Sequence, residues 1–214
     1  MEKTAPLLRT LLQFSRCVCF PPRCRHCGAV MSQDSVPLCQ LCQSLVVLKP
    51  LLQRIDGLPV TSLASYNSPL FSLLKAWKYR KDMLAADYII RWWQSAAVLH
   101  VDRSMVTASY PPVFWGKSLL RGFIPARVLA ENIGMPLSIP FCQVMPRASQ
   151  VALGRQKRLL SGFRGLVYLG KISPTMIIVD DIITTGATLN RYAHVCAARG
   201  TEKITALTLL RAEE

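Results

Sequence analysis

The sequence predicts an α/β fold, a parallel sheet flanked by helices, preceded by a small cysteine-rich module. Segments with the period of strands alternate with segments of helical spacing over residues 58–214, as in parallel sheets whose strands are joined by helices. The apolar run Met176–Val179 is typical of a strand buried on both faces. Six of the eight cysteines lie between Cys17 and Cys42, which sets the N-terminal part apart.

The boundary between module and domain is predicted after Gly57. The Gly and Pro of Asp56-Gly57-Leu58-Pro59 interrupt regular structure, so residues 1–57 are assigned to the cysteine module with a connecting segment and residues 58–214 to the α/β domain. The domain is expected to open with a strand over Val60–Tyr66 and a helix over Pro69–Tyr79, whose proline suits a first helical turn. A second helix is expected over Met83–Leu99.

The remaining elements continue this alternation. A strand over Ser104–Tyr110 ends at a Pro-Pro pair, and a helix over Arg121–Ile133 and a short strand over Ser138–Val144 follow. The closing elements are a strand, a helix that ends before Gly200 and a last strand, expected over Thr175–Val179, Ala187–Arg199 and Ile204–Leu210. Ligands of such sheets bind beyond the carboxyl ends of the strands, so functional residues are expected there.

Two adjacent carboxylates, Asp180 and Asp181, follow the closing buried strand. The loop after them is built of small and hydroxyl-bearing residues: Thr184, Thr185, Gly186, Ala187 and Thr188. Such a loop before a helix offers backbone N–H groups and the positive end of the helix dipole to a phosphate. Neighbouring carboxylates near an anion need hydroxyl donors or a cation as partners, which a phosphorylated sugar bound with Mg²⁺ supplies. The alternative is structural, with Asp capping the strand end and Thr capping the next helix.

This segment resembles the 5-phosphoribosyl-1-diphosphate (PRPP) motif of type I phosphoribosyltransferases, in which two acidic residues after a hydrophobic strand precede a TTGAT-like loop. The resemblance implies a phosphoribosyltransferase-like sheet in which Asp180 and Asp181 form the catalytic pair on the ribose hydroxyls and the loop holds the 5′-phosphate. The segment after the strand that ends near residue 110 brings Lys117 and Arg121, two cations that suit a pyrophosphate group. A surface loop leading into a helix is the alternative for this segment.

The cysteine pairs predict a structural zinc site. Eleven residues separate the first pair from the second, and each CxxC pair can form a tight turn whose thiolates face one ion. The expected ligands are Cys24, Cys27, Cys39 and Cys42. Buried reduced thiols are the alternative, and Cys17 or Cys19 could replace one ligand.

The chain is strongly basic, with 26 Lys and Arg against 12 Asp and Glu. Basic surfaces attract polyanions, and cations interleaved with aromatic rings suit single-stranded nucleic acid. The candidate contacts are Lys75, Lys78, Arg80, Lys81, Arg155, Lys157 and Arg158. General solubility is the alternative for the charge, and Trp77 on a helix is also explained as a core residue.

Over nearly its full length the sequence resembles the ComF/GntX family, whose members join an N-terminal zinc module to a phosphoribosyltransferase-like domain. The residues that carry the resemblance are the CxxC pairs, the PRPP-like motif and Arg121-Gly122-Phe123, nine residues after Pro112. The family is linked to DNA uptake and utilisation in bacterial competence, which implies binding of PRPP or a related phosphosugar and of single-stranded DNA. Active phosphoribosyl transfer from PRPP with release of pyrophosphate is the alternative, and a zinc-dependent adaptor protein is a third.

Whether the chain is an enzyme is left open by the sequence. Family members usually continue Arg-Gly-Phe with Asn-Gln, where this chain has Ile124-Pro125. No transmembrane helix is expected, because the apolar stretches Leu45–Leu52 and Tyr88–Val101 are interrupted by charged side chains. The N-terminus has no signal-peptide pattern, so the cytoplasm is the expected location.

Overall fold

The computed structural model describes residues 21–32, 35–97, 100, 107–113, 121–144, 166–170 and 172–212. These residues fall into two compact units. The first comprises the described residues up to Val47 together with Ser68–Ile89, and the second comprises Leu48–Asn67 and the described residues from Ile90 onward. Each unit is described by itself below.

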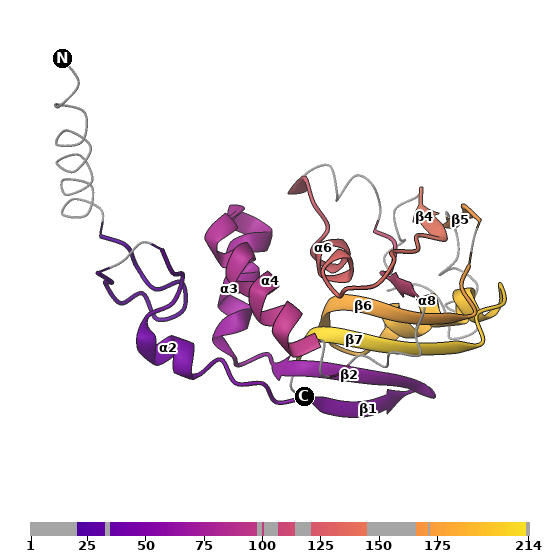
Figure 1. Cartoon of the computed structure of the whole chain (residues 1–214), viewed down its shortest axis with the longest axis horizontal. Coiled ribbons are helices and arrows are strands. Elements are labelled where there is room, and N and C mark those ends of the chain that lie inside the picture. The colour runs from indigo at the N-terminus through magenta and orange to yellow at the C-terminus, as the bar shows by residue number, and fades with distance from the viewer. Residues whose placement is uncertain are drawn as a thin grey trace, which may run out of the picture. The chain divides into compact units, whose positions relative to one another are not determined.

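The second unit is built on a mixed sheet with the strand order β1-β2-β7-β6-β3 (Figure 1). Its strands are β1 (Leu51–Ile55), β2 (Leu58–Ser65), β3 (Thr107–Ser109), β6 (Thr175–Ile183) and β7 (Lys203–Arg211). The last four pair in parallel, whereas β1 pairs with β2 in antiparallel orientation. The predicted α/β class with a mostly parallel sheet is therefore confirmed, with one antiparallel edge strand added.

Strand β6 is an interior strand of this sheet, between β7 and β3. Met176, Ile177, Ile178 and Val179 are each at most 2% exposed, because helices or loops cover both faces of a central parallel strand. The strand was expected to end at Val179, but its pairing with β7 continues through Ile183, which lies opposite Arg211. The acid pair therefore lies within the strand rather than after it.

Helix α8 (Ala187–Ala197) connects β6 to its parallel neighbour β7. Its residues Leu189, Tyr192 and Cys196 join one core cluster with Met176 and Ile178 of β6. Burial of this apolar helix face is the main stabilising contribution to such a crossover unit. The helix stops two residues earlier than expected, at Ala197 rather than Arg199.

Helix α6 (Pro125–Glu131) also contacts β6. The sequence predicted a helix from Arg121 to Ile133, but Gly122 adopts φ +84° and the regular helix starts only at Pro125. A left-handed residue cannot continue an α-helix, and proline is favoured at the first helical position. The indole N–H of Trp93 donates to the carbonyl of Leu129 over 2.9 Å, which fixes α6 against the later part of α4 (Met83–Ala97).

Strands β1 and β2 form a hairpin that the sequence did not predict. Its turn consists of Asp56 and Gly57, both with positive φ, as two-residue hairpins with the right-handed strand twist require. The boundary predicted after Gly57 falls at this turn, within the segment Leu48–Asn67 of the second unit, and stays a prediction. The strand expected over Val60–Tyr66 is β2 itself, displaced by two residues at its start and one at its end.

A separate two-stranded antiparallel sheet is formed by β4 (Phe141–Gln143) and β5 (Leu166–Tyr168). A strand of the parallel sheet was expected over Ser138–Val144, but β4 pairs with β5 instead. The residue just before this segment, Leu137, reaches the main sheet through an isolated parallel bridge with Ala108 of β3. Phe141 is still a core residue, because its ring packs edge-on to Tyr192 of α8 at 6.0 Å between centroids. The short strand thus closes one side of the core instead of extending the main sheet.

The first unit contains α2 (Gln40–Ser44), α3 (Pro69–Arg80) and the first part of α4. Helix α3 starts as predicted: the Ser68 side chain accepts a hydrogen bond from the N–H of Leu70, and Pro69 occupies the first turn. It ends at Arg80, and the next residue, Lys81, is left-handed with φ +55°. The buried residues of α3 in the core of this unit include Leu70, Leu73, Leu74 and Trp77.

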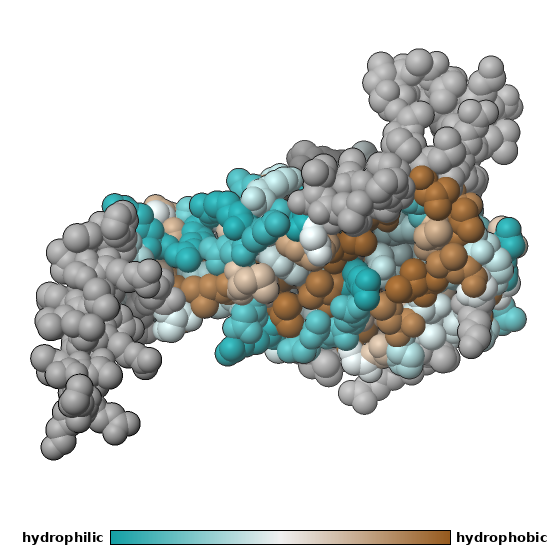
Figure 2. Space-filling model, turned by 90° about the horizontal axis from the view of Figure 1, so that it is seen from above, coloured by the Kyte–Doolittle hydropathy of each residue, from teal (hydrophilic) through white to brown (hydrophobic). Residues whose placement is uncertain are grey.

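The surface carries apolar side chains as well as charged ones. Figure 2 shows hydrophobic and hydrophilic regions next to each other on the face seen from above. In the first unit Leu41 is 79% exposed, and Leu45 and Val30 are also exposed. Scattered exposed apolar residues are ordinary for a folded protein.

Candidate metal centre and ligand-binding edge

The first cysteine pair lies in a tight turn. The N–H of Gly28 donates to the carbonyl of Cys24 over 3.0 Å, and the N–H of Cys24 donates to the carbonyl of Ala29 over 2.9 Å. Gly28 has φ +77°, a conformation that glycine adopts without steric cost. The turn brings the Cys24 and Cys27 side chains to one side, as the CxxC spacing predicted.

The second pair lies at the start of α2. Cys39 is the residue that precedes the helix, and Cys42 follows within its first turn. The N–H of Gln43 donates to the carbonyl of Cys39, and its side-chain amide donates to the carbonyl of Leu38 over 2.8 Å. A backbone hydrogen bond from Arg25 to the carbonyl of Pro37, also 2.8 Å long, joins the two turns.

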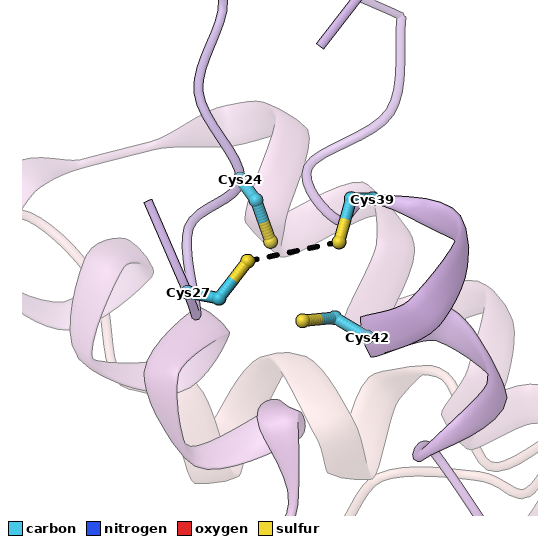
Figure 3. A group of neighbouring side chains, drawn as sticks. All are labelled: Cys24, Cys27, Cys39 and Cys42. Atoms are coloured by element: carbon cyan, nitrogen blue, oxygen red, sulfur yellow. Dashed lines mark hydrogen bonds between the residues drawn. The ribbon is translucent and has the colours of Figure 1, made fainter. Parts of the chain in front are cut away.

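The four thiols point toward one another (Figure 3). All four sulfur atoms lie within 4.8 Å of each other, and the sulfurs of Cys27 and Cys39 are 3.7 Å apart. Zinc binds thiolates at about 2.3 Å, so the corners of its tetrahedron are about 3.8 Å apart. The cluster therefore has the donor set and the spacing for one metal ion such as zinc, with no position left open for a substrate.

The acid–base behaviour of the cluster also fits a cation. Burial acts to raise the pKa of Cys24, but hydrogen bonds from the backbone of Cys27, Cys39 and His26 prevail and lower it to about 6. Burial and the neighbouring thiols raise the pKa of Cys42 above its usual range. Cys24 thus ionises readily while Cys42 resists ionisation, because burial and the like charge of Cys24 disfavour its thiolate. A divalent cation removes that repulsion and allows all four to ionise.

Two polar contacts attach the first turn to the helices of the same unit. Nε of Arg25 donates to Oδ2 of Asp82 over 2.9 Å, and Nδ1 of His26 lies 2.9 Å from Oγ of Ser72 in α3. His26 therefore contacts a hydroxyl and is not a member of the cysteine cluster.

At the other candidate site, the acid pair lies near the carboxyl end of β6. Asp180 is opposite Thr208 of β7, and its Oδ1 accepts a hydrogen bond from the N–H of Asp181 over 2.8 Å. Both carboxylates are partly buried. Ile178 and Ile183 pack into the same core cluster although their positions differ by five, an odd number, so strict alternation of side chains is not kept across the acid pair. The shared role of the two carboxylates on a sugar stays a prediction.

The loop after β6 folds as a tight connection into α8. Gly186 is buried, precedes the helix and has φ +72°. A Cβ atom on Gly186 would lie 2.6 Å from Cδ1 and 2.9 Å from Cγ2 of Ile55, so only glycine fits without a shift. Thr184 and Thr185 are exposed. Gly186, which precedes α8, has no side chain to cap the helix, but Oγ1 of Thr185 accepts a hydrogen bond from the N–H of Ala187 over 3.4 Å. The alternative of a threonine that caps the next helix is therefore met in part, by the Thr185 hydroxyl at the first N–H of α8.

The other predicted phosphosugar residues are only partly described. Ala187 is exposed and Thr188 is partly buried, both in the first turn of α8. Arg121 is partly buried, next to the left-handed Gly122. Lys117 lies outside the described residues, as do Arg155, Lys157, Arg158, Cys17 and Cys19.

The predicted nucleic-acid residues of α3 divide by exposure. Lys75, Arg80 and Lys81 are exposed, and Lys78 is partly buried. The ammonium group of Lys75 lies 4.7 Å from the centre of the Phe71 ring. Trp77 is 2% exposed, so it is a core residue and cannot stack on a base. Tyr79, at 73% exposed, is the aromatic residue of this stretch that a strand could reach.

A hollow of about 240 Å³ lies elsewhere in the second unit, along α8. Asp56, Asn190, His194 and Thr201 are among the residues that line it. The side-chain amide of Asn190 donates a hydrogen bond to Oδ2 of Asp56 over 2.6 Å. Among the predicted phosphosugar residues that the structure describes, none lines this hollow.

Among the helices that the structure describes, none combines the length and the apolar content that a bilayer crossing requires. No protein-family model matches the chain, and no curated protein matches it significantly.

Proposed function

We propose that this chain is a ComF-type protein that binds PRPP or a related phosphosugar at the carboxyl edge of β6 and acts in DNA uptake and utilisation. One observation carries the proposal. A buried parallel strand bearing Asp180 and Asp181 leads directly into a loop with a left-handed glycine and then into an eleven-residue helix. A type I phosphoribosyltransferase-like fold presents its ligand site in this order, as the resemblance implies.

The chemistry of this edge suits such a ligand. The N–H groups at the start of α8 and the hydroxyls of Thr184, Thr185 and Thr188 would hold the 5′-phosphate. Asp180 and Asp181 would accept hydrogen bonds from the ribose hydroxyls, and Mg²⁺ bound with PRPP would reduce their repulsion of the diphosphate. Lys117 and Arg121 would neutralise the diphosphate. The zinc site stabilises the first unit and takes no part in this binding.

The test is stabilisation of the protein by PRPP with Mg²⁺. We expect a rise in the melting temperature of the wild-type protein, and its loss in Asp180→Asn, Asp181→Asn and the double variant. Asp87→Asn, an exposed carboxylate of α4, is the matched control and keeps the rise. An unchanged rise in the double variant would falsify the proposed role of the acid pair.

The same experiment separates a binding protein from an active phosphoribosyltransferase. Transfer from PRPP breaks the bond between the anomeric carbon and the diphosphate, so turnover releases pyrophosphate. Release that depends on one added nucleobase supports the enzyme. Binding without release supports a sensor or scaffold role.

We also propose that the exposed end of α3 contacts single-stranded DNA. Three exposed cations, Lys75, Arg80 and Lys81, lie in the same stretch as the exposed ring of Tyr79. Cations hold the phosphates while an accessible aromatic ring stacks on a base. The buried position of Trp77 limits this surface to one stacking residue.

A further inference from the structure

Arg211 ends β7 at the edge of the sheet where the acid pair lies. It is opposite Ile183 of β6 on one side and Ser65 of β2 on the other. Its carbonyl accepts a hydrogen bond from the N–H of Tyr66 over 2.7 Å, and the N–H of Ala212 donates to the carbonyl of Ile183 over 2.9 Å. Hydrogen bonds to both neighbours therefore hold the backbone at the end of β7 in place.

The backbone of Arg211 has hydrogen-bond partners, whereas one donor atom of its side chain has none among the described residues. That atom is Nη1, and it is buried. Arg127 and Arg25 are paired with Glu131 and Asp82, and no ion pair to Arg211 occurs in the described part of the chain. A guanidinium group is charged at every physiological pH, and leaving such a donor buried without an acceptor is costly. The residue as a whole is partly exposed, although this atom is buried.

The position of Arg211 indicates what that acceptor is. Its strand neighbour Ile183 is the residue directly before Thr184, the first residue of the loop. Ligands of parallel sheets bind at this edge, and a guanidinium group binds phosphate oxygens through two parallel hydrogen bonds.

We propose that Arg211 is an anion-binding residue of this edge, which holds a phosphate or diphosphate group beside the loop after β6. The inference rests on the proposed function for the location of the ligand, and it adds a cation that the sequence motifs do not mark. It implies that the bound molecule carries an anionic group in addition to the one at the start of α8.

The test uses pyrophosphate as the probe, in a buffer without other multivalent anions. We expect Arg211→Gln to weaken pyrophosphate binding, measured by calorimetry, by about tenfold or more, since charge-assisted hydrogen bonds contribute that much. Arg211→Lys keeps the charge but not the planar guanidinium group, so its affinity for pyrophosphate should lie between those of the wild type and Arg211→Gln. Lys203→Gln, at the opposite end of β7 and exposed, is the matched control and should bind as the wild type does.

A second measurement separates anion binding from a structural role. Without pyrophosphate, Arg211→Gln should melt no lower than the wild type, because the variant removes a buried charge that has no partner. The inference is overturned if both Arg211 variants melt well below the wild type without pyrophosphate, or if Arg211→Gln binds pyrophosphate as tightly as the wild type.

The two proposals fail in different ways. If Arg211→Gln loses pyrophosphate while PRPP stabilisation does not depend on Asp180 and Asp181, the phosphosugar proposal fails and the role of Arg211 stands. If the aspartates are required and Arg211→Gln binds both PRPP and pyrophosphate normally, the inference about Arg211 fails and the phosphosugar proposal stands.

Discussion

Arg25 and Asp82 form an ion pair that attaches the first cysteine turn to the start of α4, with 2.9 Å between Nε and Oδ2. Asp82 has a second role, because its Oδ1 accepts a hydrogen bond from the N–H of Ala85 over 3.1 Å and so caps the helix. Burial acts to raise the pKa of this carboxyl, but the hydrogen bond and the charge of Arg25 prevail and lower it. Asp82 is therefore ionised throughout the neutral range.

Replacing Asp82 should separate these two contributions. Asp82→Ala removes the cap and the ion pair, and we expect a loss of about 1–3 kcal/mol in the free energy of unfolding. Asp82→Asn keeps a side-chain oxygen for the cap and loses only the charge, so the free energy of unfolding should fall by about 1 kcal/mol or less. Chemical denaturation of both variants measures the difference, and equal losses would contradict the capping role.

Metal analysis of the purified protein should find about one zinc ion per chain, because the four thiols form a single closed site. Cys39→Ser should lower this content and the stability of the first unit, since metal binding contributes to folding free energy. Cys142→Ser, a partly buried free thiol of the second unit, serves as the control and should retain the metal. A fully folded protein without bound metal is the result that excludes the zinc site.

Gly186→Ala should destabilise the second unit by about 1–3 kcal/mol, because a left-handed alanine costs about 1 kcal/mol and its Cβ meets Ile55. Gly134→Ala is the control: its φ is +81° and no atom lies within 4 Å of the added Cβ, so it shows the backbone cost alone. Ile55→Val removes the nearest carbon and should offset part of the loss when combined with Gly186→Ala. Equal losses for the two glycine variants would show that Ile55 does not restrict the loop.

Binding of single-stranded DNA should depend on the exposed end of α3. The triple variant Lys75→Gln, Arg80→Gln and Lys81→Gln should reduce the slope of log affinity against log salt by about 2, as expected for three lost phosphate contacts. Tyr79→Ala should weaken binding about tenfold without changing that slope, since stacking does not release counterions. Removing three exposed cations of the second unit, Arg54, Arg199 and Lys203, is the control for net charge. If the control weakens binding as much as the α3 variant, the charge acts nonspecifically.

The cysteine site could be predicted from spacing because a CxxC turn is local. The two residues between the cysteines determine where the thiols point, and the tertiary structure only has to bring Cys24 and Cys39 together. The acid pair shows the opposite case. Its place after an apolar run was visible, but the length of β6 depends on its pairing with β7 up to Arg211, which no local pattern marks.

The misassigned strand has the same explanation. Residues 141–143 have a strand-like pattern, and a pattern of this length states only that a strand forms, not which neighbour it pairs with. Phe141–Gln143 pairs with Leu166–Tyr168, a partner that the sequence did not indicate. The hairpin of β1 and β2 was missed because Leu51–Ile55 is a partly exposed edge strand and lacks the clear apolar alternation of a half-buried strand.

By itself, the sequence determined the α/β class, most of the helices, the order of the motif after the buried strand and the four cysteines of the metal centre. These features follow from periodicity, capping and spacing, which act over a few neighbouring residues. Only the tertiary structure decided that Trp77 is buried and Tyr79 exposed, that Ile55 closes against Gly186, and that Arg211 ends beside the loop after β6. Each of these depends on which distant segments pack together, and that choice is made by the burial of the whole core.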